Sequence, residues 1–293
     1  MSVMDVLAAP PLRHRFRAMG TSIELLVEAD EATTALAAAE QEFHRLEALL
    51  SRFRPDSELS RLNAEGSLAA GPDLLRVLGL ALEANARTGG RFDITVHDAL
   101  VAAGYDRSFE LVPADGGAPA APSPGRPAGI RVRDGIVELG PGLRLDLGGI
   151  GKGYACERAA EILATAGPCL VNAGGDIATR AGSWTVAIET AEEPLTLELS
   201  GGSALATSGR DLRRWRRAGR ELHHLIDPAT GAPSESDLLR VTVVAADAVG
   251  AEVTAKALFL AGTSAARAEA DRDGVPAVLV TGDGDTILAG GLA

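Results

Sequence analysis

An acid and a base stand four residues apart in the apolar segment GAEVTAKALFLAG, which covers residues 250–262. Its apolar spacing predicts a helix, and residues at this separation share one helix face, so Glu252 and Lys256 are neighbours there. As a surface ion pair they would stabilise the helix by only about 0.2–0.5 kcal/mol. The alternative is that this face of the helix looks into a charged site.

Two glycine-rich segments have the composition of anion-binding loops. DLGGIGKGYA starts at Asp146 and contains Lys152, and NAGGD covers residues 172–176 and ends at Asp176. A glycine turn that opens a helix leaves backbone N–H groups free, and these suit a phosphate group. Acids beside such loops hold a metal ion or a ribose hydroxyl, although each could equally cap a turn. Two such loops in one chain favour a ligand.

Neither segment matches a nucleotide-binding signature. A P-loop needs Gly-Lys followed by Ser or Thr, whereas here Lys152 is followed by Gly153. A dinucleotide-binding fingerprint needs G-x-G-x-x-G, and the spacing of Gly149, Gly151 and Gly153 does not give it. What remains is a glycine turn at which a ligand can approach the backbone closely.

The segment HHLIDPATGAP supplies a candidate acid–base residue. A histidine titrates near neutrality, so His224 can take the proton of a hydroxyl group or hold a phosphate. The structural alternative is a hydrogen-bonded histidine that ends a hairpin strand. His223 is its neighbour on the opposite strand face, and Asp227 is expected to organise the Asp-Pro-x-Thr-Gly turn.

The composition limits the class of protein. The 293 residues are 46% hydrophobic and 23% charged, an ordinary globular balance in a chain long enough to bury a large core. The net charge of −12 argues against a nucleic-acid partner, because phosphates require a basic surface. The arginine-rich run RDLRRWRRAGR at residues 210–220 is therefore predicted to be a solvated hairpin, rather than a contact for an acidic acceptor or RNA.

The number of cysteines and the hydropathy of the chain predict its cellular location. Cys156 and Cys169 are too few for a disulfide framework and suggest reducing surroundings. No apolar run approaches the roughly 20 residues of a membrane span. The start, MSVMDVLAAPPLRHRF, lacks a basic region followed by a sustained apolar core. We therefore expect a cytoplasmic protein without membrane insertion.

The elements that must position these residues follow from apolar spacing and turn signals. Helical spacing covers residues 31–53 and 71–89, and hairpin turns are predicted at residues 134–135 and 218–219. Residues 143–167 are predicted to form a strand, a glycine turn and a helix. Hairpins and neighbouring strands outnumber βαβ units, so we expect an α+β fold with largely antiparallel sheets packed with helices.

Eight segments occur in an order that is specific, although each is weak alone. They are AMGTSIELLV, SRFRPDSELSRLN, GRFDITVHDAL, LDLGGIGKGYACERAAEIL, LVNAGGDI, ATSG, HHLIDPATGAP and AEVTAKALFLAG. Together they resemble the ApbE family of flavin transferases and cover most of residues 18–262. The resemblance implies one ApbE-like domain over residues 1–293, in which the Pro/Gly-rich stretch 112–129 is a flexible loop.

The resemblance also implies a ligand and a reaction. FAD would lie in a cleft between two lobes, with a magnesium ion at its pyrophosphate. The enzyme would cleave that pyrophosphate, attach FMN through a phosphoester to a threonine or serine of an acceptor protein, and release AMP. Such chemistry needs an oriented cofactor, neutralised phosphate charge and a base near the attacking hydroxyl.

Positions that match the family motifs imply the contacts. His224 is the candidate catalytic residue. Met19 would touch the flavin or adenine, Phe53 would stack on a ring, and Lys152 would lie at a phosphate. The other implied cofactor contacts are Arg91, Phe92, Asp93, Asp146 and Leu239.

The implied metal site departs from the family pattern. The family holds its metal with Asp-x-x-x-Thr on a late helix and with a backbone carbonyl of the glycine turn. The matching positions here are Glu252, Lys256 and Gly149. Glutamate can still bind magnesium, but an ammonium group has donors and no lone pair, so Lys256 cannot be a ligand.

Three alternatives follow from this departure. The protein is a flavin transferase with a weakened or displaced metal site. Or it binds FAD with Lys256 in the place of the metal, with transferase activity, with FAD hydrolase activity or with neither. Or Glu252 and Lys256 form a simple ion pair in a non-catalytic flavin-binding module. A fourth class, an interaction protein that lost its cofactor, is disfavoured by the retained Asp146, Lys152 and His224.

Overall fold

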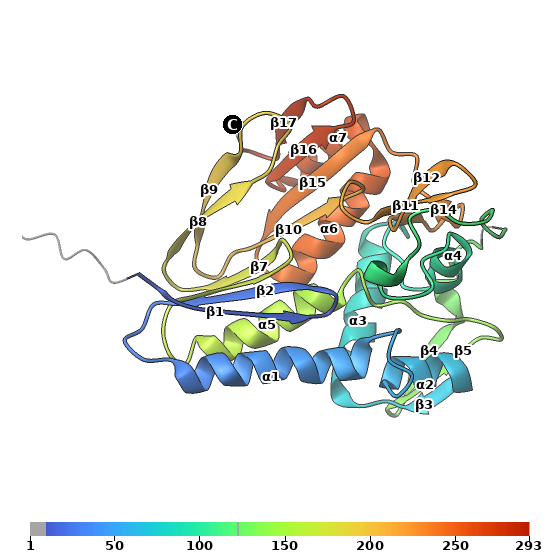
Figure 1. The fold of residues 1–293 in the computed structure, drawn as a ribbon, viewed down its shortest axis with the longest axis horizontal. Helices are drawn as coiled ribbons and strands as arrows, with labels where there is room; N and C mark the ends of the chain where they lie inside the picture. Colours follow the sequence, from blue (N-terminus) through green and yellow to red (C-terminus); the bar gives the residue numbers. More distant parts are fainter. Residues whose placement is uncertain (1–9, 122, 293) are drawn as a thin grey trace, which may run out of the picture.

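An eight-stranded sheet runs through the structure, a computed structural model that describes residues 10–121 and 123–292 (Figure 1). Its order is β1-β2-β6-β7-β10-β15-β16-β17, and every neighbouring pair is antiparallel. The strands are β1 (Leu12–Ala18), β2 (Thr21–Val27), β6 (Cys169–Ala173), β7 (Asp176–Arg180), β10 (Ala204–Gly209), β15 (Leu238–Ala245), β16 (Ala277–Thr281) and β17 (Thr286–Ala289). The predicted α+β fold with antiparallel pairing is confirmed.

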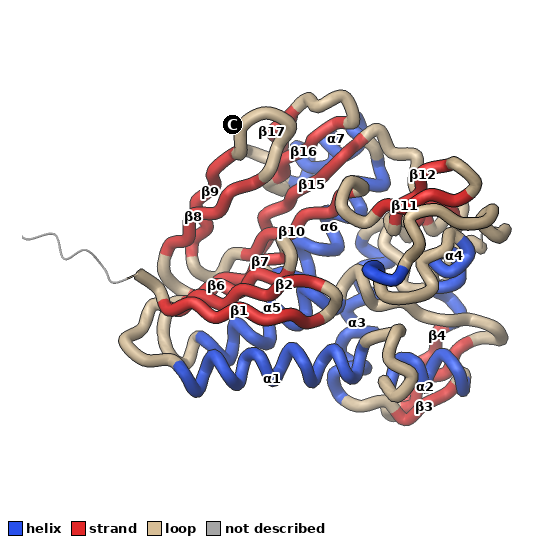
Figure 2. The backbone as a smooth tube through the Cα atoms, in the orientation of Figure 1, coloured by secondary structure: helices blue, strands red, loops and turns tan. Residues whose placement is uncertain are grey.

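Helices cover one face of this sheet (Figure 2). They are α1 (Thr33–Leu50), α5 (Gly151–Leu163), α6 (Ala248–Ala261) and α7 (Thr263–Asp273). Helix α5 packs on β6 and β7, α6 packs on β10 and β15, and α1 lies against α5. Alternate residues of β2 point to this side, so Ile23, Leu25 and Val27 are buried against it. None of the described helices has the length and apolarity that a membrane span requires.

A hairpin covers part of the opposite face. It consists of β8 (Ser183–Ile188) and β9 (Leu195–Ser200). Trp184 and Leu199 of the hairpin share a buried cluster with Ile177 and Leu205 of the sheet. The sheet is thus buried on both faces at β7 and β10, as the unbroken burial of residues 176–179 requires.

A second group of elements lies beside the C-terminal end of α1 (Figure 1). Its helices are α2 (Glu58–Glu65), α3 (Pro72–Arg87) and α4 (His97–Ala102), with 3₁₀ turns at Phe109–Leu111 and Pro127–Gly129. Its strands are β3 (Ser67–Ala69), β4 (Ile130–Arg133), β5 (Ile136–Leu139), β11 (Arg214–Arg217), β12 (Arg220–His223), β13 (Ile226–Asp227) and β14 (Ala232–Pro233). One hydrophobic cluster joins it to the main sheet, since Leu74 and Val77 of α3 pack in the same core as Phe43 of α1.

The predicted Pro/Gly-rich loop is tied to its surroundings by backbone hydrogen bonds. Ala120 N donates to Ala102 O at 3.0 Å and Gly125 N donates to Pro228 O at 2.8 Å. These bonds connect the stretch 112–129 to α4 and to the loop after β13. Its described residues are therefore attached to the second group of elements at these two points.

One predicted strand is wrong. Residues 143–147 belong to no regular element and pair with no strand in the described chain. The backbone N–H of Leu145 donates to Asn63 Oδ1 at 2.7 Å, and that of Asp146 donates to Ile94 O at 2.8 Å. A side chain and a loop carbonyl thus satisfy donors that a neighbouring strand would otherwise take.

Helices α5 and α6 approach each other closely at Gly153. A Cβ atom added there would lie 2.7 Å from Ala248 O and 3.1 Å from Glu252 Oε2. Only hydrogen fits at this position, because the backbone of α6 cannot move away as a flexible side chain could.

We predict opposite effects for two Gly→Ala changes inside helices. Gly153→Ala forces α5 and α6 apart and lowers the free energy of unfolding by about 1–3 kcal/mol. Gly79→Ala, at an exposed site of α3 where an added Cβ meets nothing within 4 Å, raises it by about 0.5–1 kcal/mol. Urea denaturation of both variants measures the two values, and equal effects would contradict the close packing.

Candidate active site

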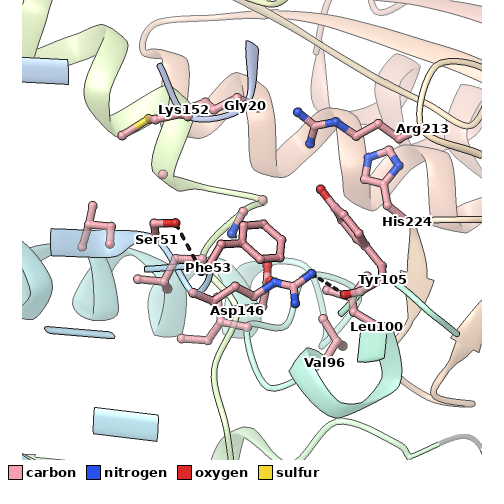
Figure 3. Close-up of a pocket in the computed structure, with 18 of the residues that line it drawn as sticks. Gly20, Ser51, Phe53, Val96, Leu100, Tyr105, Asp146, Lys152, Arg213 and His224 are labelled. Atoms are coloured by element: carbon pink, nitrogen blue, oxygen red, sulfur yellow. Dashed lines mark hydrogen bonds and ion pairs between the residues drawn. The ribbon is translucent and has the colours of Figure 1, made fainter. Parts of the chain in front are cut away.

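A cavity lies where the main sheet meets the second group of elements (Figure 3). The β1–β2 turn, the end of α1, the start of α5, the β11–β12 region and α6 each contribute residues. Of the residues that the sequence singled out, those lining the cavity are Met19, Phe53, Arg91, Phe92, Asp93, Asp146, Gly149, Lys152, His224 and Lys256. Leu239 and Glu252 are not part of its lining.

A two-residue turn brings Met19 to the cavity. Ala18 and Thr21 pair across the β1–β2 hairpin, and the turn residues Met19 and Gly20 have φ values of 52° and 67°. This geometry matches a type I′ turn, which needs positive φ at both positions and is costly for a non-glycine residue. The Met19 N–H donates to Glu47 Oε1 of α1 at 2.8 Å, which holds the turn in place.

A buried ion pair supports Asp146. Its Oδ2 accepts from Arg52 Nε, and its Oδ1 accepts from Gly148 N at 2.8 Å. The side chains of Arg52 and Asp146 are only 5% and 11% exposed, so each charge depends on the other. Arg52 also donates to Tyr105 O at 2.7 Å, and its guanidinium lies 4.2 Å from the centroid of the Phe53 ring. Phe53, by contrast, is 37% exposed and faces the cavity.

The GRFD segment forms a second wall. Arg91 is held by a bidentate pair with Glu269 of α7, with distances of 2.8 and 2.7 Å. Phe92 is fully buried beneath the cavity. The carboxylate of Asp93 accepts from Thr95 N and Oγ1, both at 2.8 Å, while burial raises its pKa above the ordinary value.

The ammonium group of Lys152 joins three elements. Lys152 Nζ of α5 donates to Asp176 of β7 and, at 2.7 Å, to Glu252 Oε1 of α6. The second oxygen of Glu252 accepts from Gly153 N at 3.0 Å. Burial raises the pKa of Asp176 to about 6. Burial also opposes the charged form of Glu252, but Lys152 and Lys256 outweigh it and lower the pKa of that carboxyl.

Lys256 lies one helical turn after Glu252 and faces the cavity. Its Nζ donates to Gly149 O at 3.3 Å and lies 5.9 Å from the centroid of the Phe92 ring. Burial lowers the pKa of Lys256, and Glu252 opposes this effect. The two residues therefore do not form the simple pair that their spacing allows, because Glu252 turns to Lys152 and Lys256 turns to Gly149.

This donor set does not fit a magnesium ion. Both oxygens of Glu252 are taken by Lys152 and Gly153, and the carbonyl of Gly149 accepts from an ammonium group. Magnesium needs oxygen ligands in a near-octahedral arrangement, which an ammonium at the same point excludes. In the described ranges 10–121 and 123–292, no three His, Cys, Asp or Glu side chains cluster as a metal site would require.

His224 stands on the cavity wall just after β12 (Figure 3). Its Nδ1 is buried and has no hydrogen-bond partner among the described residues. Burial and the positive charges of Arg213 and Lys256 hold the pKa of His224 well below its ordinary value, so the ring is neutral at pH 7. His223 points elsewhere, with its Nε2 3.0 Å from Ser234 O.

Among the lining residues that the sequence analysis missed, three bear on the chemistry of the cavity: Arg52, Tyr105 and Arg213. Arg213 belongs to the run predicted to be a solvated hairpin, yet it lines the cavity beside His224. That prediction holds for exposed Arg214 and Arg216 but is wrong for Arg213. Arg52 and Tyr105 also line the cavity. Arg52 precedes Phe53 in the segment SRFRPDSELSRLN, which resembles the ApbE family, and this position could have predicted a place near the cavity.

Comparison with known proteins identifies the family of this chain. The sequence model of the ApbE family matches residues 19–279. The chain belongs to the ApbE family. An ApbE relative from Escherichia coli K12, named FAD:protein FMN transferase, is 27% identical over 267 residues, covering 81% of this chain and 74% of the relative. A protein of the same name from Salmonella typhimurium LT2 is 30% identical over 261 residues, with the same two coverages.

Solved ApbE structures have the same fold. The ApbE protein of Thermotoga maritima superposes with a TM-score of 0.84 at 24% identity, covering 95% of this chain and 97% of that one. The flavinyl transferase ApbE of Pseudomonas stutzeri, in its apo form, gives 0.80 at 22% identity, covering 98% and 96%. The eight-stranded antiparallel sheet and its helices are thus the ApbE fold.

We predict that the pair of Arg52 and Asp146 is needed for stability. Asp146→Ala leaves a buried guanidinium without its partner and lowers the free energy of unfolding by about 3–5 kcal/mol. The matched control is Asp273→Ala, which breaks an exposed pair with Arg272 and changes it by less than about 1 kcal/mol. Urea denaturation gives both values. Adding Arg52→Met to Asp146→Ala recovers part of the loss, and equal losses for Asp146→Ala and the control would refute the pairing.

Proposed function

We propose that the protein is an FAD:protein FMN transferase that acts on a threonine or serine hydroxyl of an acceptor protein. The observation that carries this proposal is the convergence of His224, Arg213 and Lys256 on one cavity in a chain of the ApbE family. The relatives named above are FAD:protein FMN transferases. A neutral imidazole that shares a cavity with two cations is suited to taking a hydroxyl proton beside a pyrophosphate.

The cavity residues divide into those that bind and those that react. Met19, Phe53 and Tyr105 offer apolar and aromatic surface for the rings of FAD. Arg213 and Lys256 lie where they can neutralise the negative charge of the pyrophosphate. Asp146 and Lys152 hold the start of α5 in place through their ion pairs, which fixes the glycine turn beneath the ligand.

The transfer step uses His224 as the base. The acceptor hydroxyl oxygen attacks the phosphorus on the FMN side of FAD while its proton passes to His224. A phosphoester bond forms, the bond from this phosphorus to the bridging oxygen breaks, and AMP leaves with that oxygen. The proton then leaves His224 for AMP or solvent. No step is assigned to magnesium here, because Glu252, Lys256 and Gly149 do not fit the ion.

The assay for this function is incubation with FAD and threonine- or serine-containing acceptor peptides, followed by intact mass of the peptide and chromatography of AMP. An FMN adduct together with an equal amount of AMP is the expected result. AMP release without an adduct would instead indicate FAD hydrolysis. An unchanged FAD pool with every peptide would contradict both activities.

We predict that His224→Ala reduces FMN transfer by at least about 100-fold, the usual range for loss of a general base. FAD binding remains measurable by flavin fluorescence, because the ring does not hold the cofactor alone. His223→Ala is the matched control: it loses a hydrogen bond to Ser234 and some thermal stability, but its folded fraction retains transfer activity. Full activity of His224→Ala would remove the residue from the mechanism.

The pH dependence of the reaction follows from the low pKa of His224. The imidazole must be neutral to accept a proton, and its pKa lies below the ordinary 6.5. The rate constant kcat/KM for FAD, which reports the free enzyme, therefore falls only well below pH 6.5 on the acid side. Arg213→Met removes a positive charge, raises the pKa and moves this limb toward higher pH. A wild-type limb at or above pH 6.5 would contradict the assignment.

A further inference from the structure

The cavity carries an ammonium group at the point where the ApbE resemblance places a metal. Lys256 Nζ binds the carbonyl of Gly149, the backbone atom expected to hold magnesium. A Cβ at position 149 would lie 2.6 Å from this Nζ, so the glycine makes room for the lysine. The side chain of Lys256 is thus held against the glycine turn at the wall of the cavity.

The charge of Lys256 is available to a ligand, whereas that of Lys152 is not. Lys152 forms ion pairs with two carboxylates, those of Asp176 and Glu252. In the part of the chain that the structure describes, no carboxylate oxygen lies within 4.0 Å of Lys256 Nζ. Its only direct partner there is the carbonyl of Gly149, which leaves donors for an anion.

Arg213 brings a second positive charge to the same cavity. Its guanidinium lies beside His224, and no ion pair within the described ranges engages it (Figure 3). Arg213 and Lys256 both line this cavity with His224, and both positive charges lower the pKa of that imidazole. Together they supply two positive charges, the same number as one magnesium ion.

We propose that Lys256, with Arg213, replaces the divalent cation, so that this protein binds FAD and transfers FMN without a metal. This inference rests on the proposed function and identifies the residues that neutralise the negative charge of the FAD pyrophosphate. Lys256 donates to the pyrophosphate oxygens in the ground state. As the phosphorus–oxygen bond to AMP breaks, the charge that develops on the bridging oxygen is stabilised by Lys256 and Arg213.

The same geometry works against a metal. A divalent ion at Gly149 O would stand against the ammonium of Lys256, and like charges at contact distance repel. Glu252 cannot offset this repulsion without leaving Lys152, which would leave a buried cation with a single carboxylate partner. Lysine thus stands at one metal-ligand position, and the acid at the other, Glu252, binds Lys152 and not a metal.

The first experiment measures FAD and metal binding by the full-length protein. FAD affinity is determined by flavin fluorescence in EDTA and in Mg²⁺, and Mn²⁺ binding by electron paramagnetic resonance with and without FAD. We expect the FAD affinities in EDTA and Mg²⁺ to agree within about twofold and no Mn²⁺ to bind at the cavity. A loss of FAD affinity of tenfold or more in EDTA, or one Mn²⁺ bound per FAD, would overturn the proposal.

Variants of Lys256 test the ammonium group itself. Lys256→Met keeps the length of the side chain but not its charge, and weakens FAD binding in EDTA by about tenfold or more, the usual effect of losing a charge-assisted hydrogen bond. Lys256→Arg restores part of this affinity. The control Arg216→Met removes a charge from the exposed hairpin outside the cavity and leaves the affinity unchanged. Equal affinities of Lys256→Met and wild type would refute the role of Lys256.

A double variant tests whether the metal and the lysine are interchangeable. Glu252→Asp with Lys256→Thr restores the family pattern, and we expect FAD binding that is weak in EDTA and rescued by Mg²⁺. Mn²⁺ resonance then shows a bound ion in this variant alone. Rescue of the wild type by Mg²⁺ to the same extent would contradict the replacement.

Activity separates this inference from the proposed function. FMN transfer by the wild type that persists in EDTA supports both, and transfer abolished by EDTA refutes only the metal-free mechanism. Tight FAD binding in EDTA that never yields FMN adduct or AMP supports the role of Lys256 in binding and refutes the transferase. No FAD binding under any condition refutes both.

Discussion

The ammonium group of Lys152 is the point at which α5, β7 and α6 meet, since it binds the carboxylates of Asp176 and Glu252. These charges lie in the interior, where each would be costly without the others. The cluster fixes the rotation of α6 about its axis, because Glu252 must reach Lys152 and Gly153 N. One helical turn later, the same rotation directs Lys256 into the cavity.

The packing of α5 on α6 makes this electrostatic arrangement possible. Gly153 lets the two helices approach until only hydrogen fits between them, and Gly149 leaves space for the end of Lys256. The close packing of α5 on α6 therefore serves both the stability of the fold and the position of Lys256 in the cavity. The opposite wall depends on a second buried pair, Arg52 with Asp146, in which the guanidinium of Arg52 also lies over the aromatic rings of Phe53 and Tyr105.

Local signals in the sequence predicted most of the secondary structure. The helices near 31–53, 71–89 and 250–262 and the hairpins at Asp134-Gly135 and Ala218-Gly219 are all present, because periodicity and turn chemistry act over a few residues. The failure at residues 143–147 has a tertiary cause. Its alternating apolar residues fit a strand, but Asn63 and Ile94 from distant parts of the chain satisfy its backbone.

The sequence by itself determined the family and the kinds of residue at the site: glycine turns, Asp146, Lys152, His224, and Lys256 with Glu252 in place of a metal-binding pair. Only the tertiary structure decided what each charge does. Spacing of four residues allows Glu252 and Lys256 to pair, yet Lys152, which is 100 residues away from Glu252, takes the acid. Arg213 lies in a basic run, and only the fold shows that it lines the cavity while exposed Arg214 and Arg216 do not. A charge pairs with whatever the fold brings near it, and sequence distance carries no information about that.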